Sequence, residues 1–213
     1  MLELFIKGGP IMWPLLLTSI ITLGVVIDRL WFIYQEKRSR QPEKVDFMLE
    51  CLESGLTDNA IEAGTGSTDF VARTMTYALT HRDNSLSQAI LRAANLELKR
   101  FSRGLPVLDT VITLAPLLGL LGTVTGMIHS FNLLGGAELG APTAITGGIA
   151  QALIATAFGL GIAIAALLPF NYLNARLEEA RHEIEDATTQ LELLLVKCAG
   201  GSCVLRTVEQ VEA

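Results

Sequence analysis

The sequence predicts an all-α membrane protein with three transmembrane helices, and three observations of charge and hydropathy lead to this fold class. Mean hydropathy is +0.44. Only 18% of the 213 residues are charged, against about 25% in a soluble domain. The charge is missing from long stretches, since residues 8–27 and 139–175 carry none and residues 104–128 carry only Asp109. About 20 apolar residues cross a hydrocarbon core of about 30 Å, and runs of this length are helical.

The first apolar stretch predicts a membrane helix over about residues 11–33, within an N-terminal region 1–34. The alternative for any apolar N-terminus is a cleaved signal peptide. A signal peptide has a basic n-region and a small-x-small cleavage site. This stretch has neither, and it continues through Trp13 and Val26 into Asp28 and Arg29. A retained helix is therefore the prediction.

Basic residues predict the orientation, because Lys and Arg concentrate in cytoplasmic loops. One Lys precedes the first span, five basic residues lie between positions 29 and 44, and no Lys or Arg lies between positions 132 and 145. The N-terminus is therefore expected outside and the C-terminus inside. Residues 35–104 form a cytoplasmic helical segment. Residues 105–172 hold the second and third spans (about 106–131 and 146–172) with a short periplasmic loop, and residues 173–213 form a cytoplasmic helix and tail.

The predicted cytoplasmic segment reads as several short helices. Pro42 can open a helix that stops near Gly55, residues 64–68 form a break, and an apolar helical pattern runs from Val71 to Leu79. Ser85 and Gln88 have the spacing of a capping box. From there the pattern runs toward Pro106 without a turn signal. The second span is thus expected to be the upper end of a helix rooted in the cytoplasm.

The third span is likewise expected to continue as a helix beyond the membrane, past Asn171 to about Leu195. The apolar residues in this extension are separated by charged residues and form a narrow stripe. We expect such stripes to be too small to build a soluble core within one chain. They favour packing against neighbours of the same kind.

Two threonines lie at matching depth in the second and third spans. Thr123 lies nine residues before Asn132 and Thr156 lies ten residues after Thr146, so both lie about 13–15 Å from the outer end at about 1.5 Å per residue. A membrane threonine often donates to the carbonyl four residues earlier in its own helix, which is one alternative. The other is that the two hydroxyls line a polar seam.

No Asp, Glu, Lys, Arg or His lies in the middle third of any predicted span, and Asp28, Asp109 and His129 lie near span ends. Proton relays through membranes need titratable groups inside. If this protein moves protons, the carboxylate therefore comes from another chain. We also expect no enzymatic activity and no metal site. The sequence offers no nucleophile–base pair, and Cys198 and Cys203 are too far apart for a CxxC motif.

Small residues are frequent in the second and third spans. Helices in lipid associate through close packing of small residues. Gly122 and Gly126 form a GxxxG pair in the second span, and Gly148 and Gly161 are the corresponding candidates in the third. We assign these four glycines to helix packing.

Three segments resemble the ExbB/TolQ/MotA proton-channel family: GGPIMWPL (residues 8–15), APLLGLLGTVTGM (115–127) and GIAQALIATAFGL (148–160). The resemblance implies a ring, a pentamer of this subunit around the single transmembrane helices of two ExbD/TolR-like partners. It implies that an Asp of the partner carries protons and that Thr123 and Thr156 face this Asp. It also implies a multi-pass protein of the bacterial inner membrane.

The same resemblance implies a set of residues along the proton pathway: Thr123, Thr156, Pro116, Gly119, Leu120, Met127, Ala152, Gly159 and Gln151. The coupling ion is expected to be the proton, with sodium as the alternative, and no cofactor is expected. Besides the ExbD/TolR-like dimer, a TonB- or TolA-like protein is an expected partner, and nucleic acid is not. The role is expected in TonB-dependent transport or Tol-type envelope function.

The sequence departs from the family pattern at two places. Gln151 stands where many ExbB-type proteins have Glu, and Ile164, Ala165 and Ala166 stand in place of the common Ile-Pro-Ala, with Pro169 following. Two other classes of function remain as alternatives. One is a secondary transporter, which would show repeats and midplane polar groups within one chain. The other is a membrane scaffold without ion flux.

Overall fold

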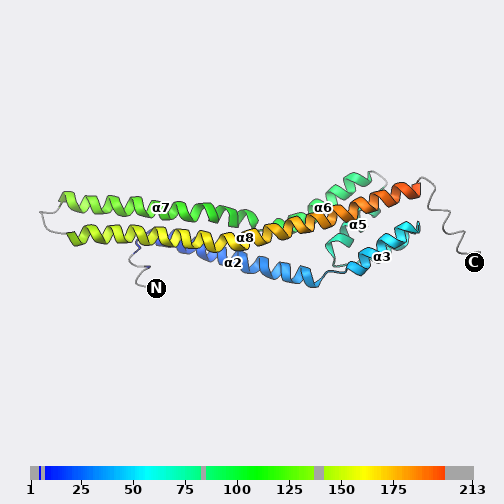
Figure 1. The fold of residues 1–213 in the computed structure, drawn as a ribbon, viewed down its shortest axis with the longest axis horizontal. Helices are drawn as coiled ribbons and strands as arrows, with labels where there is room; N and C mark the ends of the chain where they lie inside the picture. The colour runs from blue at the N-terminus through cyan, green and yellow to red at the C-terminus, as the bar shows by residue number, and fades with distance from the viewer. Residues whose placement is uncertain (1–4, 6–7, 83–84, 137–141, 200–213) are drawn as a thin grey trace, which may run out of the picture. The chain divides into compact units, whose positions relative to one another are not determined.

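The computed structural model describes residue 5 and residues 8–82, 85–136 and 142–199. Parts of the predicted outer N-terminus, the periplasmic loop and the C-terminal tail, with Cys203, lie outside this range. The described residues are organised as seven helices (Figure 1), which are α2 (Met12–Arg38), α3 (Pro42–Glu53), α4 (Thr57–Gly64), α5 (Phe70–Thr80), α6 (Leu86–Ser102), α7 (Leu105–Gly136) and α8 (Pro142–Ala199). The chain divides into two compact units, Met1–Leu30 with Gly104–Asn174, and Trp31–Arg103 with Ala175–Ala213.

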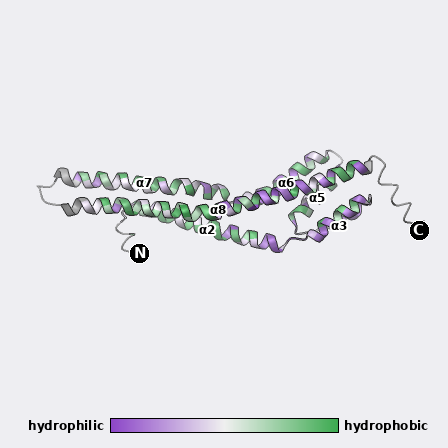
Figure 2. Ribbon diagram, viewed as in Figure 1, coloured by the Kyte–Doolittle hydropathy of each residue, from purple (hydrophilic) through white to green (hydrophobic). Residues whose placement is uncertain are grey.

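Three helices are long and apolar enough to cross a membrane, in the segments Met12–Arg38, Leu105–Asn132 and Thr146–Lys197. Figure 2 shows hydrophobic residues along α7 and the first half of α8, and many hydrophilic residues in the second half of α8. Large apolar side chains such as Leu117, Leu153 and Leu168 are exposed. A continuous exposed apolar surface of this kind suits lipid. The three predicted membrane helices are therefore confirmed as apolar helices, and α8 continues beyond Asn171 as expected.

In the first unit the three apolar helices alternate in direction. Gly119, Gly122 and Gly126 of α7 lie against Thr156, Ala155 and Ala152 of α8, so the residue numbers rise on one helix as they fall on the other. Ile11, just before α2, lies near Gly122, and Val25 lies near Gly104. Both α2 and α8 therefore run antiparallel to α7. Three successive crossings of a bilayer require this alternation.

The prediction that the second span continues a cytoplasmic helix without interruption is wrong. Helix α6 ends at Ser102, α7 begins at Leu105, and Gly104 between them has φ +86°. Helices commonly end on a glycine in this left-handed conformation, with a proline shortly after. Gly104 and Pro106 have this arrangement, which ends α6 although the apolar pattern continues. A Cβ at Gly104 would also lie 3.1 Å from Cγ1 of Val25.

The second unit has an apolar core of its own, so the expectation that one chain could not build a soluble core is wrong. Buried side chains from α3, α4, α5 and the second half of α8 form one cluster, which contains Met48, Cys51, Leu52, Ala60, Phe70, Val71, Ala72, Met75, Leu79, Ala180, Ile184, Ala187 and Leu191. The sequence reading missed α4, whose eight residues are too few to show periodicity. Once α4 and α5 cover it, the narrow stripe of α8 is sufficient.

Three short helices of the second unit, α3, α5 and α6, begin at a proline or at a capping side chain. Helix α3 has Pro42 at its first turn, and the backbone N–H of Gln88 donates to Oγ of Ser85 at the start of α6 (3.5 Å). Helix α5 is capped by Asp69, which accepts from the backbone N–H of Val71 at 2.9 Å. A side-chain acceptor at this position satisfies one of the free N–H groups of the first turn.

Asp69 also anchors an ionic cluster at the start of α5. Its carboxylate is fully buried and accepts from the backbone N–H of Gln41 (2.8 Å) and from Nη1 of Arg40 (3.1 Å). Arg40 pairs in addition with Glu183 of α8 and lies over the ring of Phe70, 4.5 Å from its centroid. Arg40 therefore links the segment after α2 to α5 and α8 within the second unit.

Candidate functional site

The contact between α7 and α8 in the first unit is built on residues with little or no side chain. A Cβ atom added at Gly119 would lie 3.0 Å from Cα of Thr156, and one added at Gly159 would lie 2.5 Å from the carbonyl oxygen of Ala115. At Gly122 the added atom would lie 2.5 Å from Cβ of Ala155. The backbones therefore approach each other directly, as small-residue packing in membranes allows.

Thr156 makes a hydrogen bond across this contact. Its hydroxyl donates to the carbonyl oxygen of Gly119 on α7, at 3.0 Å. The approach is possible because Gly119 has no side chain to cover its own backbone. Thr156 is half-buried, and a hydroxyl oxygen that donates one hydrogen bond can still accept from a further group.

Thr123 bonds within its own helix. Its hydroxyl donates to the carbonyl oxygen of Leu120 at 2.6 Å, the kind of local bond considered above as the alternative to a polar seam. In a regular helix the carbonyl of Gly119 accepts the backbone N–H of Thr123, so the hydroxyl of Thr156 reaches the same carbonyl to which Thr123 is bonded. The structure thus brings the two threonines to one level of the helix pair.

The other residues predicted for the proton pathway fall into two groups. Gly119, Ala152 and Gly159 are buried in the contact between α7 and α8. Leu120 and Met127 are 57% and 48% exposed, which leaves them free to meet another chain, and Pro116 inside α7 is half-buried. The pathway set therefore includes three residues that hold the helix pair together.

Gln151 lies against the segment that leads into α2. A Cβ at Gly9 would overlap the side-chain amide of Gln151, and Gly9 has φ +75°. Only glycine avoids both the overlap and the steric cost of this conformation. Within a single chain Gln151 thus packs on a backbone turn. The sequence signal for this turn is the Gly8-Gly9-Pro10 run.

The glycines assigned to packing divide in the same way. Gly122, Gly126 and Gly148 lie in the contact of α7 with α8, and Gly126 would bring a Cβ to 3.1 Å from Cβ of Ala152. Nothing lies within 4 Å of a Cβ placed on Gly161. Gly161 instead lines a groove of about 460 Å³ between α2 and α8, together with Ser19 and Thr22 of α2. Sequence reading did not single out these two hydroxyls.

The ionisable residues near the span ends are peripheral to the threonine level. Asp109, one turn into α7, is exposed, and so is His129. Asp28 pairs with the neighbouring Arg29 at 2.6 Å. The carbonyl–hydroxyl centre at Gly119, Thr123 and Thr156 can therefore accept and donate hydrogen bonds, but it holds no charge of its own.

Comparison with known proteins agrees with the architecture. A sequence profile described as the MotA/TolQ/ExbB proton channel family matches residues 62–186. An ExbB-like 1 biopolymer transport protein of Synechocystis sp. is 36% identical over 200 residues, which cover 91% of this chain and 78% of that protein. An ExbB homolog of Methanothermobacter thermautotrophicus is 30% identical over 188 residues, covering 86% of this chain and 66% of that protein.

A relative from the Tol branch matches over a shorter range. The Tol-Pal system protein TolQ of Haemophilus influenzae is 35% identical over 114 residues, which cover 54% of this chain and 50% of TolQ. The profile and the two longer matches extend over most of the helices described above. The chain belongs to the MotA/TolQ/ExbB proton channel family.

Proposed function

We propose that this chain is the channel-forming subunit of a motor in the bacterial inner membrane, driven by the proton-motive force. In this proposal five copies form a ring around the single membrane helices of an ExbD/TolR-like dimer. The partner supplies the carboxylate that carries the coupling ion. That ion is the proton, and sodium is the alternative. Family membership supports the proton-channel class, and the absence of ionisable residues from the middle of the spans supports a carboxylate from outside.

The observation that carries the proposal is the hydrogen bond from Thr156 to the Gly119 carbonyl, beside Thr123. Two hydroxyls and a backbone carbonyl at one level can solvate a protonated carboxyl group as it passes. They do so without offering a fixed charge that would trap a carboxylate. A protein proton pathway in a membrane needs such partners, because an unpaired polar group in lipid is costly.

The proposed orientation places the N-terminus outside and the second unit in the cytoplasm. The distribution of Lys and Arg supports this direction, and the alternating directions of α2, α7 and α8 fit three crossings. Protons would then enter from the periplasm and leave to the cytoplasm. Each proton falling through 100 mV releases about 2.3 kcal/mol, so mechanical work on the envelope would need several protons per step.

The proposed load is a TonB- or TolA-like protein that reaches across the periplasm. Relatives named for biopolymer transport and for the Tol-Pal system support both options. The longest matches are to ExbB-like proteins, so we place TonB-dependent transport first and Tol-type envelope function second.

Hydroxyl removal tests the proposal. Thr123→Val and Thr156→Val keep the shape of the side chain and remove the hydroxyl, so proton flux through the complex with its single-span partner should fall while assembly is retained. The matched control is Thr125→Val, because the Thr125 hydroxyl donates to the carbonyl of Leu121 on its own helix and is exposed. Flux is measured in proteoliposomes with a pH-sensitive dye, and assembly by co-purification.

The result also separates the alternative functions. A scaffold without ion flux would give the same dye response for all three variants and for the unmodified complex. A secondary transporter would respond to a solute rather than to the partner. Unchanged flux in the Thr123→Val/Thr156→Val double variant would contradict the assigned role of the threonines.

A further inference from the structure

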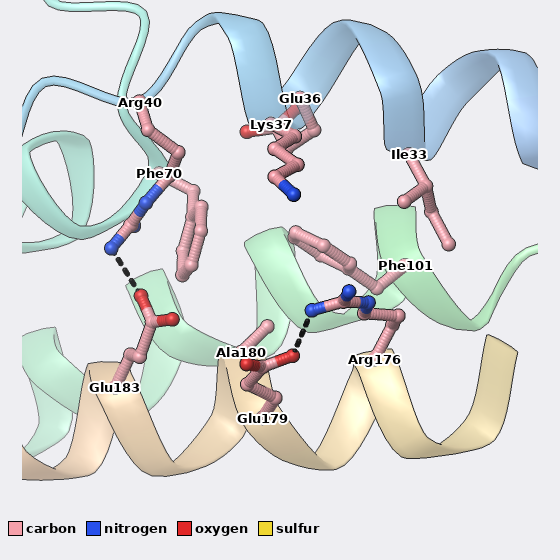
Figure 3. A pocket seen from close by; sticks show the side chains of 10 residues that line it. All are labelled: Ile33, Glu36, Lys37, Arg40, Phe70, Phe101, Arg176, Glu179, Ala180 and Glu183. Atoms are coloured by element: carbon pink, nitrogen blue, oxygen red, sulfur yellow. Dashed lines mark hydrogen bonds and ion pairs between the residues drawn. The ribbon is translucent and has the colours of Figure 1, made fainter. Parts of the chain in front are cut away.

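A cavity in the second unit lies outside everything assigned so far. It has a volume of about 340 Å³ and is open to one side between the end of α2, the helices α5 and α6, and α8 (Figure 3). Both charged and aromatic side chains line it, among them Glu36, Lys37, Arg40, Phe70, Phe101 and Arg176. The walls of a cavity in an apolar core would be apolar. The charged side chains in these walls therefore suit a polar ligand.

Most charges in the walls are already paired with each other. Arg40 pairs with Glu183, and Arg176 pairs with Glu179 at 2.5 Å, as the dashed lines in Figure 3 show. These pairs neutralise each other within the protein. They therefore do not by themselves attract a charged ligand.

Two charged groups in the walls, one of each sign, are less fully paired than these. Glu36 is only 9% exposed, and its Oε1 atom has no hydrogen-bond partner among the described residues, although Nη2 of Arg73 lies 3.9 Å from it, within ion-pair distance. Lys37 makes no ion pair with the described residues, and its amine extends into the space between α2 and α8 (Figure 3). A buried acceptor without a donor destabilises the folded state. A ligand with an N–H donor and an anionic group would satisfy both residues.

The depth of the cavity along α2 indicates where such a ligand comes from. The charge-free stretch of the chain ends at Ile27, and Trp31 and Tyr34, which follow on α2, are exposed at 70% and 64%. Exposed Trp and Tyr gather at the headgroup level of a bilayer. Ile33, Glu36 and Lys37 lie in the same two turns of α2, so this cavity wall is at headgroup depth. The most abundant zwitterions there are phospholipid headgroups.

We propose that this cavity binds the headgroup of an ethanolamine phospholipid, with the ammonium group donating to Glu36 and the phosphate beside Lys37. The rings of Phe70 and Phe101 offer aromatic surface to the ammonium end. A choline headgroup carries the same charges but has no N–H to donate. The proposal depends on the membrane location of the chain and is independent of proton conduction.

Lipid retention measured by native mass spectrometry tests the proposal. The full chain is purified from nanodiscs that contain equal amounts of ethanolamine, choline and glycerol phospholipids. We expect the ethanolamine lipid to be retained about tenfold over the choline lipid, the effect of one charge-assisted hydrogen bond. Glu36→Gln should abolish this preference, and Lys37→Gln should lower retention of every phospholipid.

Two matched variants serve as controls. Glu43 and Lys44 are exposed neighbours on α3 that do not line the cavity, so Glu43→Gln and Lys44→Gln should leave retention unchanged. Equal retention of ethanolamine and choline lipids by the unmodified chain would overturn the proposal. So would an equal loss in Lys44→Gln and Lys37→Gln.

A final arm separates a lipid from a soluble ligand of the same chemistry. Free phosphoethanolamine is added to the lipid-loaded protein and to the delipidated protein. If the free compound binds the delipidated protein and no lipid is retained at purification, the ligand is a soluble compound and the proposed lipid is ruled out. Because the lipid preference is measured on the unmodified chain, it decides the question even if a variant fails to fold.

Discussion

At the scale of single residues, the backbone of the facing helix leaves no room for a side chain at some glycines of the α7–α8 contact. Gly159 and Gly161 lie on the same helix, two residues apart. A Cβ at Gly159 would lie 2.5 Å from the Ala115 carbonyl oxygen, whereas nothing lies within 4 Å of one at Gly161. A rigid backbone atom cannot move aside as a flexible side chain can. The same substitution should therefore have opposite outcomes at the two positions.

Gly159→Ala should lower the stability of the folded chain in detergent by about 1–3 kcal/mol, the usual effect of overpacking. Gly161→Ala should be neutral or slightly stabilising, since alanine favours the helix. Thermal unfolding followed by circular dichroism measures both. Equal unfolding temperatures for the two variants would show that α7 and α8 do not approach as closely as described.

A second residue-scale prediction concerns Gly9 and Gly66, which have φ +75° and +76°. At Gly66 an added Cβ would meet nothing, whereas at Gly9 it would overlap the side chain of Gln151. Gly66→Ala should therefore destabilise by about 1–2 kcal/mol through conformation alone, and Gly9→Ala by more. Adding Gln151→Ala should recover only the excess. The comparison is made by thermal unfolding of the two single variants and the double variant.

Glu36 gives a prediction with a pH dependence, because it lies beyond the charge-free stretch of α2. Burial raises the pKa of its carboxyl group, and Arg100 and Arg73 oppose this rise, while Glu97 and Asp69 add to it. A carboxyl whose folded pKa is raised favours folding below its unfolded pKa of about 4.3. That contribution is lost as pH rises through the folded pKa.

Glu36→Gln should therefore leave the lipid-free chain as stable as the unmodified chain or more stable at pH 7. The stability difference between the two should shrink as pH falls toward 4. Thermal unfolding between pH 4 and pH 7 measures this. A large loss of stability in Glu36→Gln at pH 7 would mean that the ion pair with Arg73 outweighs burial.

At the scale of elements, the ionic cluster at the start of α5 separates two contributions of one side chain. Asp69 caps α5 and pairs with Arg40. Asp69→Asn can still accept from the backbone N–H of Val71 but loses the ion pair. Asp69→Ala loses both. Loss of a cap costs about 0.5–2 kcal/mol, and breaking a buried ion pair costs about 3–5 kcal/mol.

We therefore expect Asp69→Ala to be more destabilising than Asp69→Asn, and Asp69→Asn to be less stable than the unmodified chain. Asp58→Ala in the first turn of α4 is the control, because Asp58 is exposed and is not the residue that caps its helix. Urea unfolding followed at the second unit measures the order. An equal effect of Asp58→Ala and Asp69→Ala would contradict the assigned role of Asp69.

The helices were predictable from the sequence where hydropathy or capping chemistry is strong. The three apolar helices, the start at Pro42 and the cap at Ser85 were all found this way. Two features were not. The short helix α4 has too few residues for a periodic pattern, and the break at Gly104 lay inside a continuous apolar pattern that outweighed a single glycine.

The candidate site shows the same division. The sequence alone predicted that Thr123 and Thr156 lie at the same depth, because the rise per residue is constant along a helix. The partner of each hydroxyl could not be predicted. Whether Thr156 donates to its own helix or to Gly119 depends on how closely α7 approaches, and that distance is set by residues on both helices.

At the scale of the whole molecule, the proposal divides the work between two chains. The chain alone should not conduct protons, because its spans hold no titratable group in their middle third. Dye-monitored proton flux in liposomes should therefore need the single-span partner. Equal flux with and without the partner would refute the division.

Helix α8 is continuous over 58 residues, from Pro142 to Ala199. Each residue added to a helix turns everything after it by about 100°. One inserted or deleted residue between Ala152 and Gly159, which both pack on α7, would thus turn one of the two away from that helix. Natural length variation in this stretch should therefore be rare, and should come in steps of about seven or eleven residues, which nearly restore the phase.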